Sequence, residues 1–261
     1  MSHETGVNTD EFVEKVAELV GKHPGIYYPI ALEDSCVSKH PDKGDMLNDV
    51  FCSVFTLYNN GLFDSIRLMI RYEKSLKAWE EIASTIDDES LRNSVVMDYV
   101  HPVFMVICDI PNTFKDRLAC GCVKLASLAK GDDSYLVEID KKGRPNRLSW
   151  FNEMKAVCPD ASLGSRLCEI VEKELYECAD AEHFRRIHGM SIHDLSPSLV
   201  SGLRDVSSMG NGLTAWSYSK SFDLCKELEV IDRHRCRMQD AYLLFGEYGD
   251  MLYAGLLNDN R

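Results

Sequence analysis

Apolar residues recur at spacings of three and four along most of this 261-residue chain, and this spacing is the strongest constraint on its fold. Residues so spaced share one face of an α-helix, whereas a half-buried strand alternates apolar and polar residues. The longest example follows Ser219 and forms one seam: Leu224, Leu228, Ile231, Arg235, Met238, Tyr242 and Phe245. Such alternation is typical of helices packed against antiparallel neighbours. We therefore predict an all-α protein built as a helical bundle.

Shorter runs of helically spaced apolar residues, separated by glycine and proline residues, divide the rest of the chain into elements. We expect residues 1–44 to form an N-terminal helix and an extended arm, and residues 45–261 to form the bundle. Asn60-Gly61 predicts the end of one helix, and Pro102 predicts a kink or break near Val100. Asp109 to Asn112 is the next expected boundary. Two further stripes predict helices on either side of residue 150: Phe114, Leu118, Cys122, Leu125 and Ala129; and Leu163, Leu167, Val171, Leu175 and Cys178.

One segment has the character of strands. Residues 134–139 and 147–150 flank a turn that contains Gly143 and Pro145, which predicts a β-hairpin inserted at about residues 134–150. Its turn carries a concentration of basic side chains that could contact RNA phosphates or an acidic partner: Lys141, Lys142, Arg144 and Arg147. A solvated hairpin tip is the alternative. Residues 202–216, which are rich in glycine and serine, read as a loop.

Charge and cysteine usage limit the classes of protein to consider. The net charge of -13 repels polyanions on average, so RNA would need a local basic site. The ten cysteines are scattered and include no Cys-x-x-Cys pair, which argues against a zinc ribbon and favours a reducing cytoplasm. The N-terminus has no apolar signal core, and the apolar stretch near residues 100–110 is too short to span a membrane. We expect a cytoplasmic protein with no membrane partner.

The segment from Glu182 to Asp194 concentrates side chains that can act near neutral pH. His183, His188 and His193 are five residues apart, which places them about 140° from one another on a helix, so they cannot share one face. We therefore expect no metal and no cofactor here. Gly189 would permit the helix to break, and a break would let Arg186 and His193 meet.

Six residues separate Arg186 from His193, and this spacing resembles the Arg-x(4–6)-His motif of HEPN-domain proteins, which are helical bundles. The segment from Phe184 to His188, with His193 to Pro197, is similar to the region after the penultimate bundle helix of that family. The resemblance covers the helical region from residue 45 onward. The polar residue usual directly after the motif arginine is Ile187 in this chain.

The HEPN resemblance implies metal-independent RNA cleavage or RNA binding in stress or defence, by a homodimer that pairs two copies of the motif. Arg186 would hold the phosphate and His193 would act as general acid or base, with Arg185, His188 and Asp194 in support.

Two other functions remain open. One is a non-catalytic helical module that binds a protein partner. The other is a metal-dependent HD-type hydrolase, suggested by the adjacent His193 and Asp194. Arg235, inside the apolar seam, needs either a carboxylate partner or an exposed position at the end of the seam.

Overall fold

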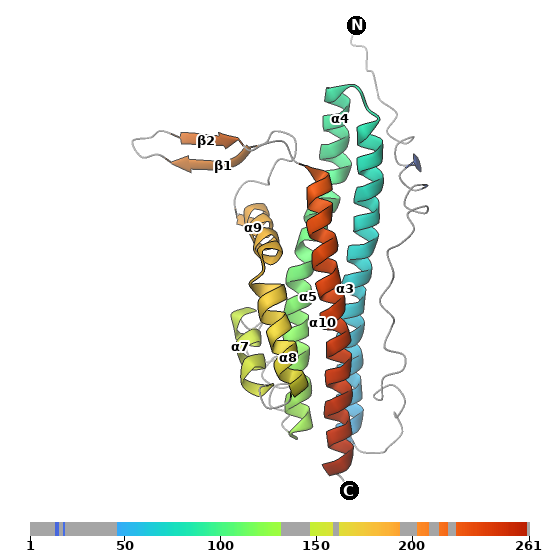
Figure 1. Cartoon of the computed structure of the whole chain (residues 1–261), viewed down its shortest axis with the longest axis vertical. Coiled ribbons are helices and arrows are strands. Elements are labelled where there is room, and N and C mark those ends of the chain that lie inside the picture. The colour runs from blue at the N-terminus through green and yellow to red at the C-terminus, as the bar shows by residue number, and fades with distance from the viewer. Residues whose placement is uncertain are drawn as a thin grey trace. The chain divides into compact units, whose positions relative to one another are not determined.

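The structure is a computed structural model that describes residues 14–15, 18, 46–131, 147–158, 162–193, 203–208, 214–218 and 223–259. Helices dominate these residues (Figure 1). In chain order the elements are α3 (Met46–Ser84), α4 (Glu89–Val95), the π-helix η1 (Val96–Val100), α5 (His101–Ala129), α7 (Arg147–Val157), α8 (Ser162–Ile170), the π-helix η2 (Val171–Tyr176), α9 (Ala179–His193), β1 (Leu203–Ser208), β2 (Thr214–Tyr218) and α10 (Leu224–Asp259). The prediction of an all-α fold is confirmed at this level.

The predicted hairpin at residues 134–150 is not supported. Its second strand is wrong, because Arg147–Trp150 forms the first turn of α7. Residues 132–146 lie outside the described part of the chain. An antiparallel pair occurs instead between β1 and β2, where Val206 lies opposite Trp216 within a stretch predicted to be a loop. Tyr218 and Trp216 alternate with smaller residues in β2, a short period-2 pattern that the neighbouring glycines and serines obscured.

Helix α3 runs without interruption through Asn60-Gly61, so the helix end predicted there is wrong. The buried residues Phe55, Leu62 and Ile66 stay in phase across the glycine, and burying that face outweighs the cost of about 1 kcal/mol for a helical glycine. The side chain of Arg117 packs against Gly61 and donates a hydrogen bond of 3.0 Å to the Gly61 carbonyl oxygen.

The irregularity predicted near Val100 is the π-helix η1, in which the N–H of His101 bonds to the carbonyl of Val96. The wider turn keeps the chain helical up to Pro102 instead of ending it. The boundary predicted at Asp109 to Asn112 is wrong, because α5 continues through Pro111. Pro111 is itself buried, so apolar burial opposes the loss of one helical hydrogen bond there.

The helical stretch Glu89–Ala129 has the length and composition of a candidate membrane span. Mostly buried core helices of soluble proteins and signal sequences meet the same two criteria, and 33% of the apolar window is buried here. The C-terminal half of α5 contributes many buried residues to the core: Phe114, Leu118, Ala119, Cys122, Val123, Leu125, Ala126 and Leu128.

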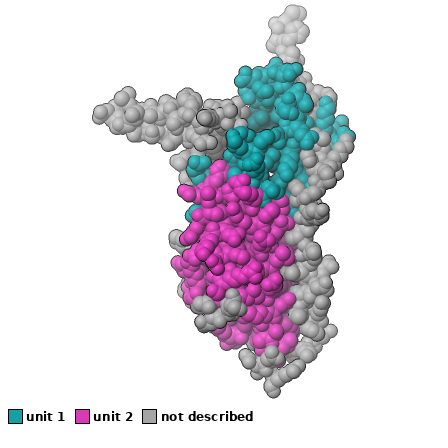
Figure 2. Space-filling view, in the orientation of Figure 1, with its two compact units in different colours: residues 1–27, 69–109, 185–232 teal, residues 28–68, 110–184, 233–261 magenta. Residues whose placement is uncertain are grey.

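The chain divides into two compact units (Figure 2). The first comprises residues 1–27, 69–109 and 185–232. Within it, the rings of Trp79 and Tyr99 stack with centroids 4.6 Å apart, and the Cys225 thiol contacts a carboxylate oxygen of Glu80. These contacts join the C-terminal part of α3 to η1 and to the start of α10.

The second unit comprises residues 28–68, 110–184 and 233–261. Its core joins α3 to α10, since the rings of Phe55 and Phe245 stack in parallel planes with centroids 5.7 Å apart. Gly249 allows this approach, because a Cβ atom at that position would lie 2.3 Å from the ring of Phe55. The apolar seam predicted for α10 is buried along most of its length, from Leu228 to Phe245.

Candidate functional site

Helix α9 carries the motif on which the functional prediction rests. The helix buries Ala181, Phe184 and Ile187 and exposes Arg185 and Arg186. This division follows the helical period, because the buried positions recur every three residues. The two adjacent arginines therefore lie on the solvent side of α9.

The break predicted at Gly189 is wrong, since α9 is continuous to His193. Since Arg186 and His193 are seven positions apart on one helix, their backbones are two turns and about 10 Å apart. A helix propensity cost of about 1 kcal/mol for Gly189 permits a break but does not require one. The side chains of His188 and His193, and all of Asp194, lie outside what the structure describes.

Of the four basic residues predicted to bind RNA, the structure describes only Arg147. Arg147 is the first residue of α7, a helix and not the expected strand. Lys141, Lys142 and Arg144 lie outside the described residues.

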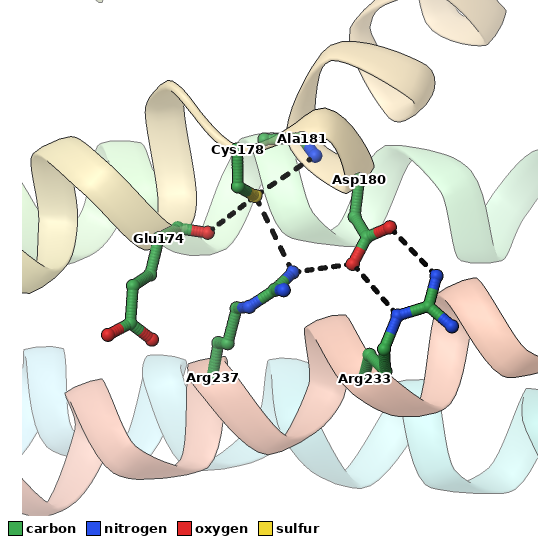
Figure 3. A network of polar contacts seen from close by, with 6 residues as sticks. All are labelled: Glu174, Cys178, Asp180, Ala181, Arg233 and Arg237. Carbon is green, nitrogen blue, oxygen red and sulfur yellow. Dashed lines mark hydrogen bonds and ion pairs between the residues drawn. The ribbon is translucent and has the colours of Figure 1, made fainter.

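The best-defined polar site of the second unit is a cluster centred on Asp180, in the first turn of α9 (Figure 3). Two arginines one turn apart on α10 hold its carboxylate. Arg233 donates from Nη2 to Oδ1 at 3.0 Å and from Nε to Oδ2 at 3.4 Å, while Arg237 donates from Nη1 to Oδ2 at 2.5 Å. Charge-assisted bonds of this kind are about twice as strong as neutral ones.

Cys178 extends this cluster toward the preceding turn. Its thiol donates to the Glu174 carbonyl oxygen at 2.8 Å and accepts the N–H of Ala181 at 3.3 Å. Arg237 Nη1 also lies 3.5 Å from the Cys178 sulfur. The thiol therefore acts as a cap, because it satisfies one of the free backbone N–H groups at the start of α9.

Burial of the Asp180 carboxyl raises its pKa, but the hydrogen bonds and charges of Arg233 and Arg237 outweigh burial and hold the pKa below its usual value. The positive end of the α9 dipole acts in the same direction. Asp180 is therefore ionised at neutral pH. One carboxylate faces two guanidinium groups, so the cluster carries an excess positive charge, on the side of Arg233, whose side chain is half exposed.

His234 lies between these two arginines in sequence but points into the core. Its side chain is buried, its ring meets that of Phe184 edge-on at 5.1 Å, and its Nδ1 atom has no hydrogen-bond partner among the described residues. Burial, and to a lesser degree the charge of Arg237, lower its pKa to about 4. The imidazole is therefore neutral at physiological pH.

These groups were not identified from the sequence, because Asp180 and Arg233 are 53 positions apart in the chain. The spacing of Arg233 and Arg237 was the available signal, since residues four apart share a helix face. The expectation of an exposed seam end at Arg235 is wrong. Arg235 is buried, and it donates a hydrogen bond of 2.8 Å to Gln239 on its own helix.

The polar groups of the described site are guanidinium, carboxylate, thiol and imidazole side chains. Among the residues that the structure describes, no group of three or more His, Cys, Asp or Glu side chains is placed to hold a metal ion. The exposed arginines of α9 can bind an anion, and the Asp180 cluster fixes the first turn of that helix to α10. No family model, curated protein or solved structure matches the chain.

Proposed function

We propose that this is a HEPN-like helical protein that binds RNA through α9. The observation that supports the proposal is the pair of adjacent, exposed arginines at positions 185 and 186 of a helix whose other face is buried. Guanidinium groups bind phosphate oxygens with paired, charge-assisted hydrogen bonds. Phosphate contacts of this kind provide most of the affinity of sequence-independent binding.

The acidic character of the chain makes a local binding surface necessary. With a net charge of -13, most of the surface repels RNA. Binding therefore depends on the few arginines that meet the backbone directly, and it weakens steeply as salt is added. The Asp180 cluster supports such a surface indirectly, since it fixes the first turn of α9 through two ion pairs.

Cleavage is the second part of the proposal. Arg186 holds the scissile phosphate, and His193 moves the proton of the 2′-hydroxyl group, with Arg185, His188 and Asp194 in support. Because about 10 Å of helix separates positions 186 and 193, both groups act on one phosphate most simply in a homodimer, with one residue from each copy. No metal ion takes part in this reaction scheme.

Anisotropy of labelled single-stranded RNA tests the binding part. We expect Arg185→Ala with Arg186→Ala to weaken binding about tenfold at low salt and to reduce the slope of log affinity against log salt by about 0.7 for each lost phosphate contact. Arg166→Ala, which removes an exposed arginine of α8, is the matched control. Equal losses in the control and in the double variant would show a general charge effect and contradict a site on α9.

Cleavage of the same RNA in EDTA tests the catalytic part. We expect Arg186→Ala and His193→Ala each to abolish cleavage, and an equal mixture of the two variants to recover part of it. Recovery follows from a site shared between copies, because a mixed dimer contains one intact Arg186 and His193 pair. Cleavage that requires an added divalent cation would favour the hydrolase that uses His193 and Asp194. Inert wild-type protein that also fails to bind RNA would favour the interaction module.

A further inference from the structure

Three cysteines lie close together in the second unit. Cys122 comes from α5, Cys158 follows α7, and Cys168 lies on α8. Cys158 Sγ lies 3.2 Å from the hydroxyl oxygen of Tyr248 on α10, and the Cys158 N–H donates to the Met154 carbonyl oxygen at 3.0 Å. Cys168 Sγ also lies 3.8 Å from the carbonyl oxygen of Met154. All three cysteines are reduced.

A cavity of about 350 Å³ reaches this cluster. Cys158, Tyr248 and Lys130 supply its polar groups, and its other walls are apolar, with Val157 and Leu252 among them. The volume is at the small end of the range for ligand sites, so it suits a small molecule. Cys158 is almost fully buried but lines the cavity, so a small molecule inside the cavity would lie against this residue.

Close packing fixes the position of Cys158. A Cβ atom at Gly164 of α8 would lie 2.5 Å from the Cys158 carbonyl oxygen and 3.2 Å from the ring of Tyr248. Only glycine allows α8 to approach this closely. The same approach brings the neighbouring turn of α8, with Cys168, against Cys158.

The surroundings of Cys158 favour its thiolate form. The hydrogen bond from Cys168 lowers the pKa of Cys158, and the Tyr248 hydroxyl and the charge of Lys130 add to this effect, so burial is outweighed. The pKa of Cys168 is raised, mainly because its proton is held by Cys158. Cys158 is therefore the first of the two thiols to lose its proton, and Cys168 is the donor. Cys122 is fully buried, and burial raises its pKa.

We propose that Cys158 is a reactive thiol that is oxidised by small hydroperoxides entering the cavity, and that Cys168 is the partner with which it then forms a disulfide. A thiolate in contact with hydrogen-bond donors, a route for a small oxidant and an adjacent second thiol are the three parts that such a site requires. This inference is independent of the proposed action on RNA.

The chemistry balances in two steps. The Cys158 thiolate attacks the terminal oxygen of the hydroperoxide, a sulfur–oxygen bond forms, the oxygen–oxygen bond breaks, and an alcohol or water leaves after taking up one proton. Cys168 sulfur then attacks Cys158 sulfur, the sulfur–oxygen bond breaks, and hydroxide leaves as water with the Cys168 proton. The two sulfurs lose two electrons in total, and the hydroperoxide gains them.

Peptide mapping of the full chain after treatment with hydrogen peroxide, without reductant, tests this site. We expect a Cys158–Cys168 disulfide to form about tenfold faster than Cys225 is oxidised, because Cys225 has no second thiol beside it among the described residues and its contact with Glu80 raises its pKa. With Cys168→Ser, Cys158 should instead accumulate as a sulfenic acid that a 1,3-diketone traps. Thiol reductant should reverse the disulfide in the wild type.

Two variants complete the experiment. Cys236→Ser, which changes an exposed cysteine of α10, should leave the disulfide and its rate unchanged. Tyr248→Phe keeps the ring but removes the hydroxyl group, so it should slow oxidation several-fold while the helical circular dichroism spectrum stays the same. Preferential oxidation of Cys225 or Cys236 in the folded protein, or a disulfide that joins Cys122 to Cys158, would overturn the proposal.

Discussion

Asp180 links the start of α9 to α10 through ion pairs with Arg233 and Arg237. Its carboxylate is buried, and it receives hydrogen bonds from Arg233 and Arg237. A carboxylate in this position stabilises the folded chain only while it is ionised. Removing it leaves two guanidinium groups facing each other, one of them half exposed. The cost is therefore less than the value of about 3–5 kcal/mol that is typical when a fully buried pair is broken.

We predict that Asp180→Asn lowers the free energy of unfolding by about 2 kcal/mol at neutral pH, as measured by urea denaturation. The folded-state pKa of Asp180 is depressed, so its contribution is complete above the unfolded value of 3.8 and is lost as pH falls below it. The difference between wild type and variant should shrink in that acid range. Asp240→Asn, at an exposed position of α10, is the control. An equal loss in both variants would contradict the role of the cluster.

Helix contacts in the second unit depend on glycine at two crossing points. Gly249 of α10 faces the ring of Phe55, and Gly121 of α5 lies where a Cβ atom would be 3.0 Å from both Phe245 and Tyr58. Neither glycine is needed for an unusual backbone conformation, because both lie inside regular helices. Their role is to let three helices approach closely enough to stack aromatic rings between them.

We predict that Gly249→Ala destabilises the protein by about 1–3 kcal/mol, because the strain of an extra methyl group against Phe55 exceeds the gain in helix propensity. Gly255→Ala on the same helix is a matched control, since nothing lies within 4 Å of the added Cβ atom. It should raise the free energy of unfolding by up to about 1 kcal/mol. Thermal or urea unfolding measures both, and stabilisation by both substitutions would contradict the close contact.

Elements with a continuous apolar phase could be predicted from the sequence, whereas their ends could not. The seam of α10 was correct from Leu228 to Phe245, because burying it is the main stabilising term for that helix. Gly61 and Pro111 were read as boundaries because each disfavours a helix locally. Neither ends one, since the local cost is smaller than the apolar burial gained by the helices that pass through them.

The candidate site was predicted less well for a different physical reason. The exposed Arg185 and Arg186 were identified, but Asp180, Arg233 and His234 were not. Their contacts depend on how two helices meet, which no local pattern in the chain encodes. The thiol pair was missed likewise, because the spacing of Cys158 and Cys168 has meaning only once Gly164 brings α8 against Cys158.

At the scale of the whole molecule, buried ionisable groups couple the folding equilibrium to pH. His234 has a folded-state pKa of about 4 and an unfolded value of 6.5, with Arg237, Asp180 and Lys115 as its charged neighbours. Between these values the unfolded chain binds a proton that the folded chain does not. Stability therefore falls as pH drops from 6.5 toward 4.

We predict that the wild type loses about 2 kcal/mol of unfolding free energy between pH 7 and pH 5 through His234, from the difference of its two pKa values. His234→Gln should lack this part of the pH dependence, whatever its stability at pH 7. His183→Gln, which changes a half-buried histidine of α9, should retain it. Urea denaturation at pH 7 and pH 5 measures this fall in the free energy of unfolding. If His234→Gln showed the same fall as the wild type, groups other than His234 would be its cause.

The spacing of Arg233 and Arg237 also bears on whether α10 could shift along its axis relative to Asp180. Arg233 and Arg237 are one helical turn apart, so a shift of α10 by one turn would move one guanidinium into the place of the other and keep the carboxylate paired. Charge alone thus permits two registers of α10. The ring of Phe55 permits one, because only Gly249 leaves room for it. The ion pairs attach α9 to α10, whereas Gly249, which has no side chain, determines the register of α10 against α3.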